Sequence, residues 1–410
     1  MRMKKYFVPA YIEELETPEG LHIYNNYNGA EILLEKEEIE EYWEIKKHGI
    51  EKIKAGLCEC LFEEEILVTA RMQMKFADEL KNMLDNTLCI TLMPTESCNF
   101  KCIYCYETHE IVKMSVETVN AIKSYVTELC EEHQFARIAV LWFGGEPTLC
   151  PEIIEDVGGH IKAIADKKKI EFESSMTTNA YLLTKERFER FLVLGITSYQ
   201  ITIDGFEHDS RRMLCDGGST LKQILDNLRE IKSVGPEKNF NIMIRRNLLA
   251  CDRTCEWYDY LSKEFGDDKR FTYSVVQVER NGSSKDAELE IIEQDNDLVQ
   301  RHLKYLVEKN MGVTLQLEPE IFGGVCFAAY RYGYLFRANG DVGKCTIELY
   351  NPLNYVGRVE NGTVIIDEEK LKCWTMDYFD KKCSSCKNAL LCMNRSCPMK
   401  HLQGQKHICI

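Results

Sequence analysis

The sequence predicts an α/β protein whose centre is a partial (β/α)6 barrel of the TIM type. Two observations lead to this prediction: strand-like and helix-like runs alternate from residue 87 to residue 278, and a group of three cysteines follows the first strand-like run. Alternation of this kind produces parallel strands with helices packed outside them. Active sites in such barrels lie at the C-terminal ends of the strands, which is where the cysteines fall.

Three segments of the 410-residue chain differ in pattern, and this length suits two or three domains. We expect a winged-helix-like module over residues 1–85, the partial barrel over 86–312 and a cysteine-rich domain over 313–410. The last segment has several glycines and few clear helices, so we expect metal ions to organise its fold. The hydrophobic share of 45% is that of a globular protein with a substantial core.

The N-terminal segment begins with two β-like stretches, residues 5–14 and 21–34, which are joined through the turn signal Pro18-Glu19-Gly20. Apolar residues then recur at helical spacing in three runs, at residues 37–47, 50–68 and 76–84. A hairpin with three short helices is the outline of a winged helix. The helices are acidic, which weighs against DNA binding. Capture of a peptide by strand addition to the sheet edge remains open.

Six strand-like runs form the expected barrel, and amphipathic helix-like runs lie between them. In the helix-like run 115–132, for example, Val119, Ile122, Val126 and Leu129 form one apolar stripe. The strand-like runs are residues 88–92, 138–143, 170–177, 198–203, 240–247 and 271–278.

Cys98, Cys102 and Cys105 form a Cys-x3-Cys-x2-Cys group just after the first strand. Iron–sulfur clusters are normally held by four thiolates, so three with no nearby fourth indicate a four-iron cluster with one open coordination position. Structural zinc sites pair their ligands two and two, which fits less well. Three unconnected buried cysteines are the simpler alternative, because free cysteine is often buried.

Composition limits the setting of the protein. The chain has nineteen cysteines, and we recognise neither a signal peptide at its start nor an apolar run long enough to span a membrane. We therefore expect a cytoplasmic, reducing environment, where many cysteines indicate metal ligation more often than disulfides. The net charge of −15 argues against a nucleic-acid partner, since phosphate binding needs clustered Lys and Arg.

A second motif makes the pattern specific. Gly144-Gly145-Glu146-Pro147 directly follows the second strand. Together with the cysteine triplet it resembles the radical S-adenosylmethionine (radical SAM) enzymes, in which a GGEP motif engages the amino group of the cofactor. The resemblance extends from about residue 87 to residue 410. It implies that the triplet holds a 4Fe-4S cluster whose open iron is chelated by the amino and carboxylate groups of S-adenosylmethionine.

The same resemblance implies further cofactor contacts at the strand ends. An aromatic before the last cysteine is similar to the residue that packs near the adenine, and polar residues end the third and fourth strands. One arginine follows the fourth strand, and another on the fifth strand is a candidate for binding the cofactor carboxylate. The alternatives are core packing for the aromatic, turn chemistry for the polar residues and a structural ion pair for the arginine on strand five. The expected cofactor-binding residues are Tyr104, Gly144, Gly145, Glu146, Pro147, Thr178, Asn179, Thr202, Asp204, Arg212 and Arg245.

The C-terminal cysteines resemble the SPASM domain, which narrows the family to the branch that carries it. The resemblance implies two auxiliary 4Fe-4S clusters, three clusters in all. One departure is the spacing before Cys397, where four residues stand instead of three. The inner cluster lacks an obvious fourth ligand, so either Cys373 completes it or one iron is open to substrate. The implied ligands are Cys383, Cys386, Cys392 and Cys409 for the distal cluster, and Cys326, Cys345 and Cys397 for the inner one.

The family chemistry implies reductive cleavage of S-adenosylmethionine and hydrogen abstraction from a substrate. Our first hypothesis is maturation of a ribosomally made precursor peptide by a thioether bond from a cysteine, because the N-terminal module resembles the peptide-recognition domains of such maturases. The second is an anaerobic sulfatase-maturing enzyme, and Thr346, where those enzymes usually have Asp, weakens it. The third is a non-catalytic electron-transfer protein. Flavodoxin or ferredoxin would supply electrons, and no residue is predicted as catalytic acid or base.

Overall fold

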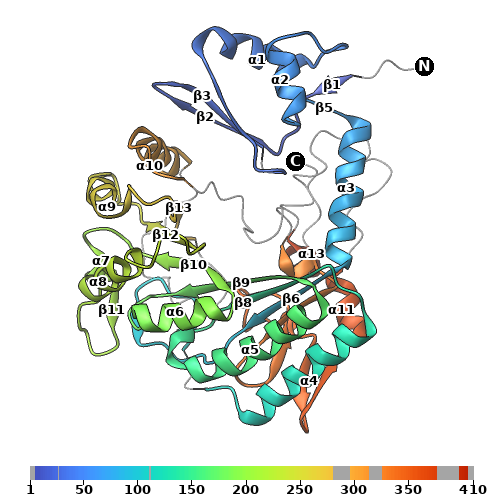
Figure 1. The fold of residues 1–410 in the computed structure, drawn as a ribbon, viewed down its shortest axis with the longest axis vertical. Coiled ribbons are helices and arrows are strands. Elements are labelled where there is room, and N and C mark those ends of the chain that lie inside the picture. The colour runs from blue at the N-terminus through green and yellow to red at the C-terminus, as the bar shows by residue number, and fades with distance from the viewer. Residues whose placement is uncertain are drawn as a thin grey trace. The chain divides into compact units, whose positions relative to one another are not determined.

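The computed structural model describes residues 5–25, 27–109, 112–279, 296–313, 326–375 and 397–404. The chain divides into two compact units, which Figure 1 draws as ribbons. The smaller unit comprises Met1–Asp85, Gln316–Arg331 and Lys372–Ile410, and the larger comprises Asn86–Leu315 and Tyr332–Leu371.

The N-terminal part of the smaller unit contains two antiparallel sheets. Strands β2 (Ile12–Thr17), β3 (Gly20–Asn25) and β4 (Glu31–Leu34) form a three-stranded sheet in that order. The tight turn at residues 18–19 joins the first two, as the sequence predicts. The second predicted β stretch is divided into two strands. A short pair, β1 (Tyr6–Phe7) with β5 (Val68–Thr69), was not predicted.

Three helices accompany these sheets: α1 (Lys36–His48), α2 (Leu57–Glu63) and α3 (Ala70–Asp85). The predicted helices are therefore present, although α2 covers only the middle of its predicted run. Helix α1 ends at His48 and is followed by Gly49, whose φ is +64°, and a Cβ on Gly49 would lie 2.5 Å from the Tyr6 carbonyl oxygen. Only glycine meets both conditions at this turn.

The larger unit is built on a parallel sheet, and all six predicted strands are confirmed within two residues at each end. Neighbours in this part of the sheet follow chain order, as expected for a partial barrel. Every residue of the first strand is buried, which is typical of parallel strands covered on both faces. The strands are β6 (Thr87–Leu92), β8 (Arg137–Trp142), β9 (Glu171–Thr178), β10 (Ile196–Thr202), β12 (Asn241–Leu248) and β13 (Phe271–Gln277).

Helices follow these strands along the chain. In α4 (Val116–Glu132) the predicted stripe is buried, and the Ser115 hydroxyl accepts the Thr118 N–H at 3.0 Å to cap the helix start. Gly158 in the next helix lies close to the buried Trp142 ring. The other helices of this unit are α5 (Pro151–Lys168), α6 (Lys185–Val193), α7 (His208–Arg211), α8 (Leu221–Lys232), α9 (Trp257–Phe265) and α10 (Asn296–Glu308).

The sheet continues past the predicted barrel. Strand β14 (Tyr332–Phe336) pairs in parallel with β6, on the side opposite β8, and β15 (Asp341–Gly343), β16 (Gly357–Glu360) and β17 (Thr363–Ile366) extend it in antiparallel fashion. Over the described ranges, the sheet therefore has ten strands. The sequence predicted little regular structure beyond Gly312, so these four strands are an addition.

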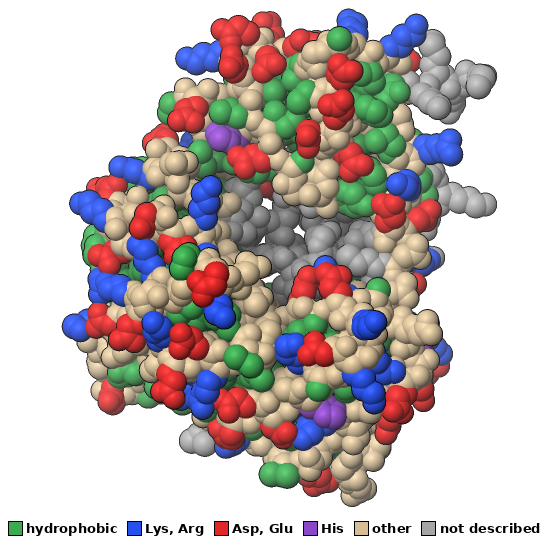
Figure 2. Space-filling model, in the orientation of Figure 1, with side chains coloured by type: hydrophobic (Ala, Val, Ile, Leu, Met, Phe, Trp, Pro, Cys, Tyr) green, Lys and Arg blue, Asp and Glu red, His purple; other side chains and the backbone are tan. Residues whose placement is uncertain are grey.

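Shorter elements complete the described chain: β7 (Phe100–Cys102), β11 (Arg212–Leu214), α11 (Glu368–Trp374) and α13 (Pro398–Leu402). Among the helices that the structure describes, none is long and apolar enough to cross a bilayer. On the face drawn in Figure 2, Lys and Arg side chains are interspersed with Asp and Glu over the larger unit.

Candidate active site

The cysteine triplet lies on the loop that leaves β6, as predicted. Its middle part is strand β7, which pairs with β11 so that Cys102 lies opposite Arg212. Two more backbone bonds hold this ribbon, from the Ile103 N–H to the Arg211 carbonyl at 2.9 Å and from the Cys215 N–H to the Asn99 carbonyl at 3.0 Å. The segment after β10 therefore fixes the loop that carries the cysteines.

Backbone amides point at the sulfur atoms of the predicted ligands. The Phe100 N–H donates to Cys98 Sγ at 3.3 Å, and the Glu107 N–H donates to the Cys105 thiol. Hydrogen bonds to sulfur favour the thiolate, the form that binds iron. Burial raises the pKa of both thiols and of Cys102, where the Arg212 charge opposes the rise. Ligation would therefore release protons.

The donor set fits a cluster better than a single ion. In the described ranges, no three His, Cys, Asp or Glu side chains converge closely enough to hold one metal ion. Ligands of a four-iron cluster bind different iron atoms, so their sulfurs need not converge on one point. Three half-buried thiols on one loop, two of them accepting backbone amides, match that requirement.

The Gly144–Pro147 turn packs directly on the triplet loop. Gly144 has a φ of +116°, and a Cβ there would lie 2.5 Å from the Thr95 carbonyl oxygen. A Cβ on Gly145 would lie 2.3 Å from the Ser97 carbonyl oxygen. The Glu146 N–H donates to that same oxygen at 2.9 Å. The two glycines are therefore needed for a close backbone contact within the protein.

Glu146 joins the ends of two strands beneath this turn. Its buried carboxylate accepts from the Thr148 N–H at 3.0 Å, the Thr178 hydroxyl at 2.7 Å and the Asn179 N–H at 2.7 Å. The Asn179 side-chain amide then donates to Asn99 Oδ1 at 2.8 Å, on the triplet loop. Burial raises the pKa of Glu146, and these donors oppose the rise. Three predicted segments are thus brought together at the ends of β6, β8 and β9.

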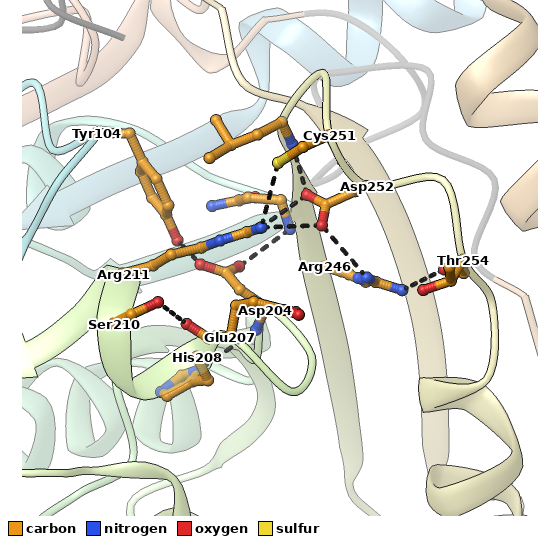
Figure 3. Close-up of polar contacts among 12 residues, drawn as sticks. Tyr104, Asp204, Glu207, His208, Ser210, Arg211, Arg246, Cys251, Asp252 and Thr254 are labelled. Carbon is orange, nitrogen blue, oxygen red and sulfur yellow. Dashed lines mark hydrogen bonds and ion pairs between the residues drawn. The ribbon is translucent and has the colours of Figure 1, made fainter. Parts of the chain in front are cut away.

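Tyr104 and Asp204 meet at the end of β10. The Tyr104 hydroxyl donates to Asp204 Oδ2, and the two side chains point toward one another in Figure 3. Arg212 Nη1 donates to the same hydroxyl at 3.1 Å. Asp204 Oδ1 accepts the Asn247 N–H at 3.2 Å, and the Asp204 N–H donates to His208 Nδ1 at 3.2 Å. This aromatic is therefore an anchored polar residue, beyond the simple packing role that the sequence left open.

The remaining predicted residues lie on β10 and its neighbour β12. Thr202 on β10 is in register with Arg245 on β12. Arg245 Nη1 donates to Gln200 Oε1 at 3.2 Å. The pair stands at the C-terminal half of both strands, next to Asp204.

A buried ion network next to these residues was missed by sequence reasoning. Both terminal nitrogens of Arg211 donate to the Asp252 carboxylate, at 2.7 and 2.9 Å. Arg246 Nη2 lies 3.5 Å from the same carboxylate (Figure 3). The Asp252 carbonyl bonds to His302 Nε2 at 2.9 Å. The partners are 41 and 50 residues apart, so no local spacing reveals them.

A second missed contact involves Glu96, two residues before the first cysteine. Arg337 donates Nε to Glu96 Oε1 at 3.0 Å and Nη2 to Glu96 Oε2 at 2.6 Å. Both side chains are almost fully buried. Glu107, just past the triplet, is buried as well, and burial together with the Glu96 charge raises its pKa to about 8.

Comparison with known proteins agrees with this geometry. Residues 92–252 match the family model of the radical SAM superfamily. This part of the chain is therefore similar to a radical SAM domain. The matched residues run from the end of β6 to the Asp252 network, and so contain the triplet, the Gly144–Pro147 turn, Asn179 and Asp204.

Proteins that are similar to this chain in sequence include enzymes whose names refer to nucleotide substrates. A GTP 3',8-cyclase of Listeria welshimeri is 31% identical over 188 residues, which are 46% of this chain and 53% of the relative. An S-adenosylmethionine-dependent nucleotide dehydratase of a Fibrobacter species is 28% identical over 164 residues, or 38% of this chain and 46% of that one. The chain thus spans about half the length of the curated relatives it matches.

Two solved structures share the fold over more of the chain. The protein anSMEcpe with bound AdoMet has a TM-score of 0.53 and 17% identity, and the match covers 74% of this chain and 88% of that one. Streptococcus suis SuiB bound to precursor peptide SuiA has a TM-score of 0.51 and 14% identity, with 98% of both chains covered. At these identities the likeness concerns the fold.

Beyond the radical SAM domain, the structure describes four of the C-terminal cysteines. Cys345 lies in the larger unit on a loop organised by the buried Asn354, which accepts the Lys344 and Cys345 N–H groups and donates to the Cys345 and Glu348 carbonyls. The Glu348 N–H donates to Cys345 Sγ at 3.5 Å, as at the triplet. Cys326, Cys373 and Cys397 belong to the smaller unit.

The distal auxiliary ligands, Cys383, Cys386, Cys392 and Cys409, lie outside the described residues. The assignment of two auxiliary clusters, with Cys326, Cys345 and Cys397 at the inner one, stays a prediction. The bounds of the three predicted domains likewise stay predictions.

Proposed function

We propose that this protein is a radical SAM enzyme that modifies a ribosomally synthesised precursor peptide by joining a peptide cysteine to another residue through a thioether. The observation that carries the catalytic part is the meeting of the triplet loop, the Gly144–Pro147 turn, Asn179 and Asp204 at the C-terminal ends of neighbouring parallel strands. In barrels of this kind that edge is the active site.

The residues present suit the cofactors. Cys98, Cys102 and Cys105 would hold a 4Fe-4S cluster, and the cluster with S-adenosylmethionine would supply a 5′-deoxyadenosyl radical. The chain's own part is orientation. The backbone of the Gly144–Pro147 turn would face the methionine end of the cofactor, with Glu146 holding the turn in shape through its bonds to Thr148 and Thr178.

A peptide substrate is supported by two observations. SuiB and anSMEcpe, which share the fold, are described in complex with peptides, SuiA and Kp18Cys. In the smaller unit, β4 pairs with β3 alone among the described strands, and its Leu33 is 43% exposed. A peptide strand could extend the sheet at that edge.

The main alternative is a nucleotide substrate, because the sequence relatives include GTP 3',8-cyclases. The similarity to these enzymes covers about half of their length, and residues 92–252 of this chain match the radical SAM family model. A sulfatase-maturing activity is a further alternative, and Thr346 after Cys345 remains the feature that disfavours it. Cytoplasmic location and reduction by flavodoxin or ferredoxin stay part of this proposal.

The test is an anaerobic reconstitution with iron, sulfide, S-adenosylmethionine and dithionite. The substrates are GTP and, where a short cysteine-rich reading frame lies beside the gene, the peptide that it encodes. Release of 5′-deoxyadenosine together with a peptide product lighter by two hydrogen atoms would support a thioether. Loss of the peptide sulfur would instead indicate formylglycine formation, and consumption of GTP alone would reject the peptide reading. The Cys98→Ala/Cys102→Ala/Cys105→Ala protein is the control and should release none.

Peptide docking at β4 has its own test. Replacing Leu33→Glu should weaken binding of the peptide at least tenfold by fluorescence anisotropy while leaving S-adenosylmethionine binding unchanged. Val193→Glu, at a residue on α6 that is 76% exposed, is the matched control. Equal affinity in the two variants would remove the β4 edge from the proposal.

A further inference from the structure

The two ends of the triplet loop are both bonded to one later segment of the chain. Before the cysteines, Glu96 receives a two-pronged donation from Arg337, at 3.0 and 2.6 Å. After them, the Thr108 N–H and hydroxyl both contact the Tyr350 hydroxyl, at 2.9 and 2.8 Å. Residues 337–350 therefore bracket the loop that carries Cys98, Cys102 and Cys105.

Arg337 uses its third nitrogen on the loop of Cys345. Nη1 donates to the Leu349 carbonyl at 3.1 Å and to the Tyr355 hydroxyl at 2.8 Å. Its guanidinium also lies over the Tyr350 ring, 5.1 Å from the centroid. Leu349 is next to Glu348, whose N–H donates to Cys345 Sγ. One side chain therefore bonds both to the triplet loop, through Glu96, and to the loop of Cys345, a predicted ligand.

The contact is buried. The side chains of Glu96 and Arg337 are 2% and 3% exposed. An apolar cluster of Met93, Leu335 and Leu349, with Tyr106 and Tyr350 packed against it, lies beside them. A bidentate arginine–carboxylate pair has fixed geometry, and its charges are poorly screened when buried.

We propose that Arg337 is a positioning residue for the cluster at Cys98, Cys102 and Cys105, which balances the Glu96 charge beside that cluster and is itself held in place by the Cys345 loop. The inference rests on the proposed iron–sulfur function. Its consequence is electrostatic: the buried pair sets the reduction potential of the triplet cluster, since adding an electron is opposed by a nearby uncompensated negative charge and favoured by a positive one.

The test is an electron paramagnetic resonance redox titration of the reconstituted full-length protein. The triplet cluster is the component absent from the protein with all three triplet cysteines changed to Ala. Arg337→Gln leaves Glu96 uncompensated and should lower the midpoint potential, whereas Glu96→Gln leaves Arg337 uncompensated and should raise it. A tenfold change in relative affinity for the reduced cluster corresponds to about 59 mV for one electron.

The double variant Glu96→Gln/Arg337→Gln restores neutrality and should return the potential close to that of the wild type. If the midpoint potential shifts with the same sign in both single variants, or does not shift in either, the proposal is overturned. An electrostatic role requires the shift to follow the sign of the removed charge, whereas a purely structural role does not. Arg270→Gln is the control, since it breaks the bidentate pair with Asp268 at the N-terminal end of β13.

Two measurements keep folding apart from the effect. Iron content and circular dichroism identify a variant that fails to fold, and Tyr350→Phe then provides a milder change, which removes only the hydroxyl that contacts Thr108. The Tyr350→Phe variant should speed hydrogen exchange at the Thr108 amide at least tenfold and leave the midpoint potential unchanged. Unaltered exchange would count against the claim that residues 337–350 hold both ends of the triplet loop. If the wild-type protein binds no iron at the triplet, the proposed function fails. If it binds iron there but the midpoint potential does not shift with the charge changes at Glu96 and Arg337, only this inference fails.

Discussion

Replacing Gly145 with alanine tests whether the Gly144–Pro147 turn must touch the triplet loop. The added Cβ would lie 2.3 Å from the Ser97 carbonyl oxygen, 2.5 Å from its carbon and 2.6 Å from the Glu96 carbonyl oxygen. All three atoms are backbone, so no side chain can move aside. The turn must therefore separate from the loop, and the bonds from Gly145 N–H to Thr95 and from Glu146 N–H to Ser97 are lost.

The magnitude follows from these contacts. Overpacking costs about 1–3 kcal/mol and each lost hydrogen bond about 0.5–1.5 kcal/mol, or about 2–6 kcal/mol together. Even the lower value would raise the local opening constant roughly 30-fold, because about 1.4 kcal/mol corresponds to tenfold. The loss falls on the loop that presents the cysteines, so we expect weaker iron retention as well.

Hydrogen exchange at the amides of residues 145 and 146 measures this directly, since exchange reports local opening. Gly159→Ala is the matched control. Its Cβ would find only Leu194 Cδ2 at 3.8 Å, and alanine is the better helix former within α5. Unchanged protection at residue 146 in the Gly145→Ala protein, or equal loss in the control, would refute the steric reasoning.

Three further outcomes are expected. Asp252→Asn breaks the buried pair with Arg211 and should lower the free energy of unfolding by about 3–5 kcal/mol, checked by thermal and urea melts. Asn354→Ala removes four hydrogen bonds around Cys345 and should cost about 2–6 kcal/mol and reduce iron content, with triplet iron unchanged by electron paramagnetic resonance. Burial lowers the pKa of His208 from 6.5 to about 3, so below pH 6.5 the unfolded chain binds more protons than the folded chain. The free energy of unfolding should therefore fall by about 2 kcal/mol from pH 6.5 to pH 5. The His208→Gln variant should lack this dependence of stability on pH.

Local patterns were sufficient for the barrel and the triplet. The six parallel strands are recognisable because strand-like runs alternate with helix-like runs along the chain, and the triplet and Gly144–Pro147 are defined by spacing within a few residues. The sequence also suggested that these glycines serve the approach of a ligand. The structure gives them a partner within the chain, the carbonyls of Thr95 and Ser97, and nothing in a single sequence indicates which backbone a glycine will touch.

Long-range pairing set the limit. Strands β15 to β17 contain three or four residues each, too few for a clear alternation, and β14 finds its place beside a strand that begins 245 residues earlier, at Thr87 against Tyr332. Glu96 and Arg337 are 241 residues apart. Each looks like an ordinary charged residue, and only the folded chain makes them a buried pair.

The pairing of β14 with β6 also bears on when the protein can become competent. During synthesis the N-terminal part of a chain emerges first and begins to fold early. Here β6, whose six residues are all buried in the finished protein, has its second neighbour only after Phe336 has left the ribosome. The triplet loop obtains Arg337 at the same moment. The cysteines are thus made well before the residues that hold their loop in place, and an iron–sulfur cluster bound there before Arg337 is made would lack the Glu96–Arg337 contact.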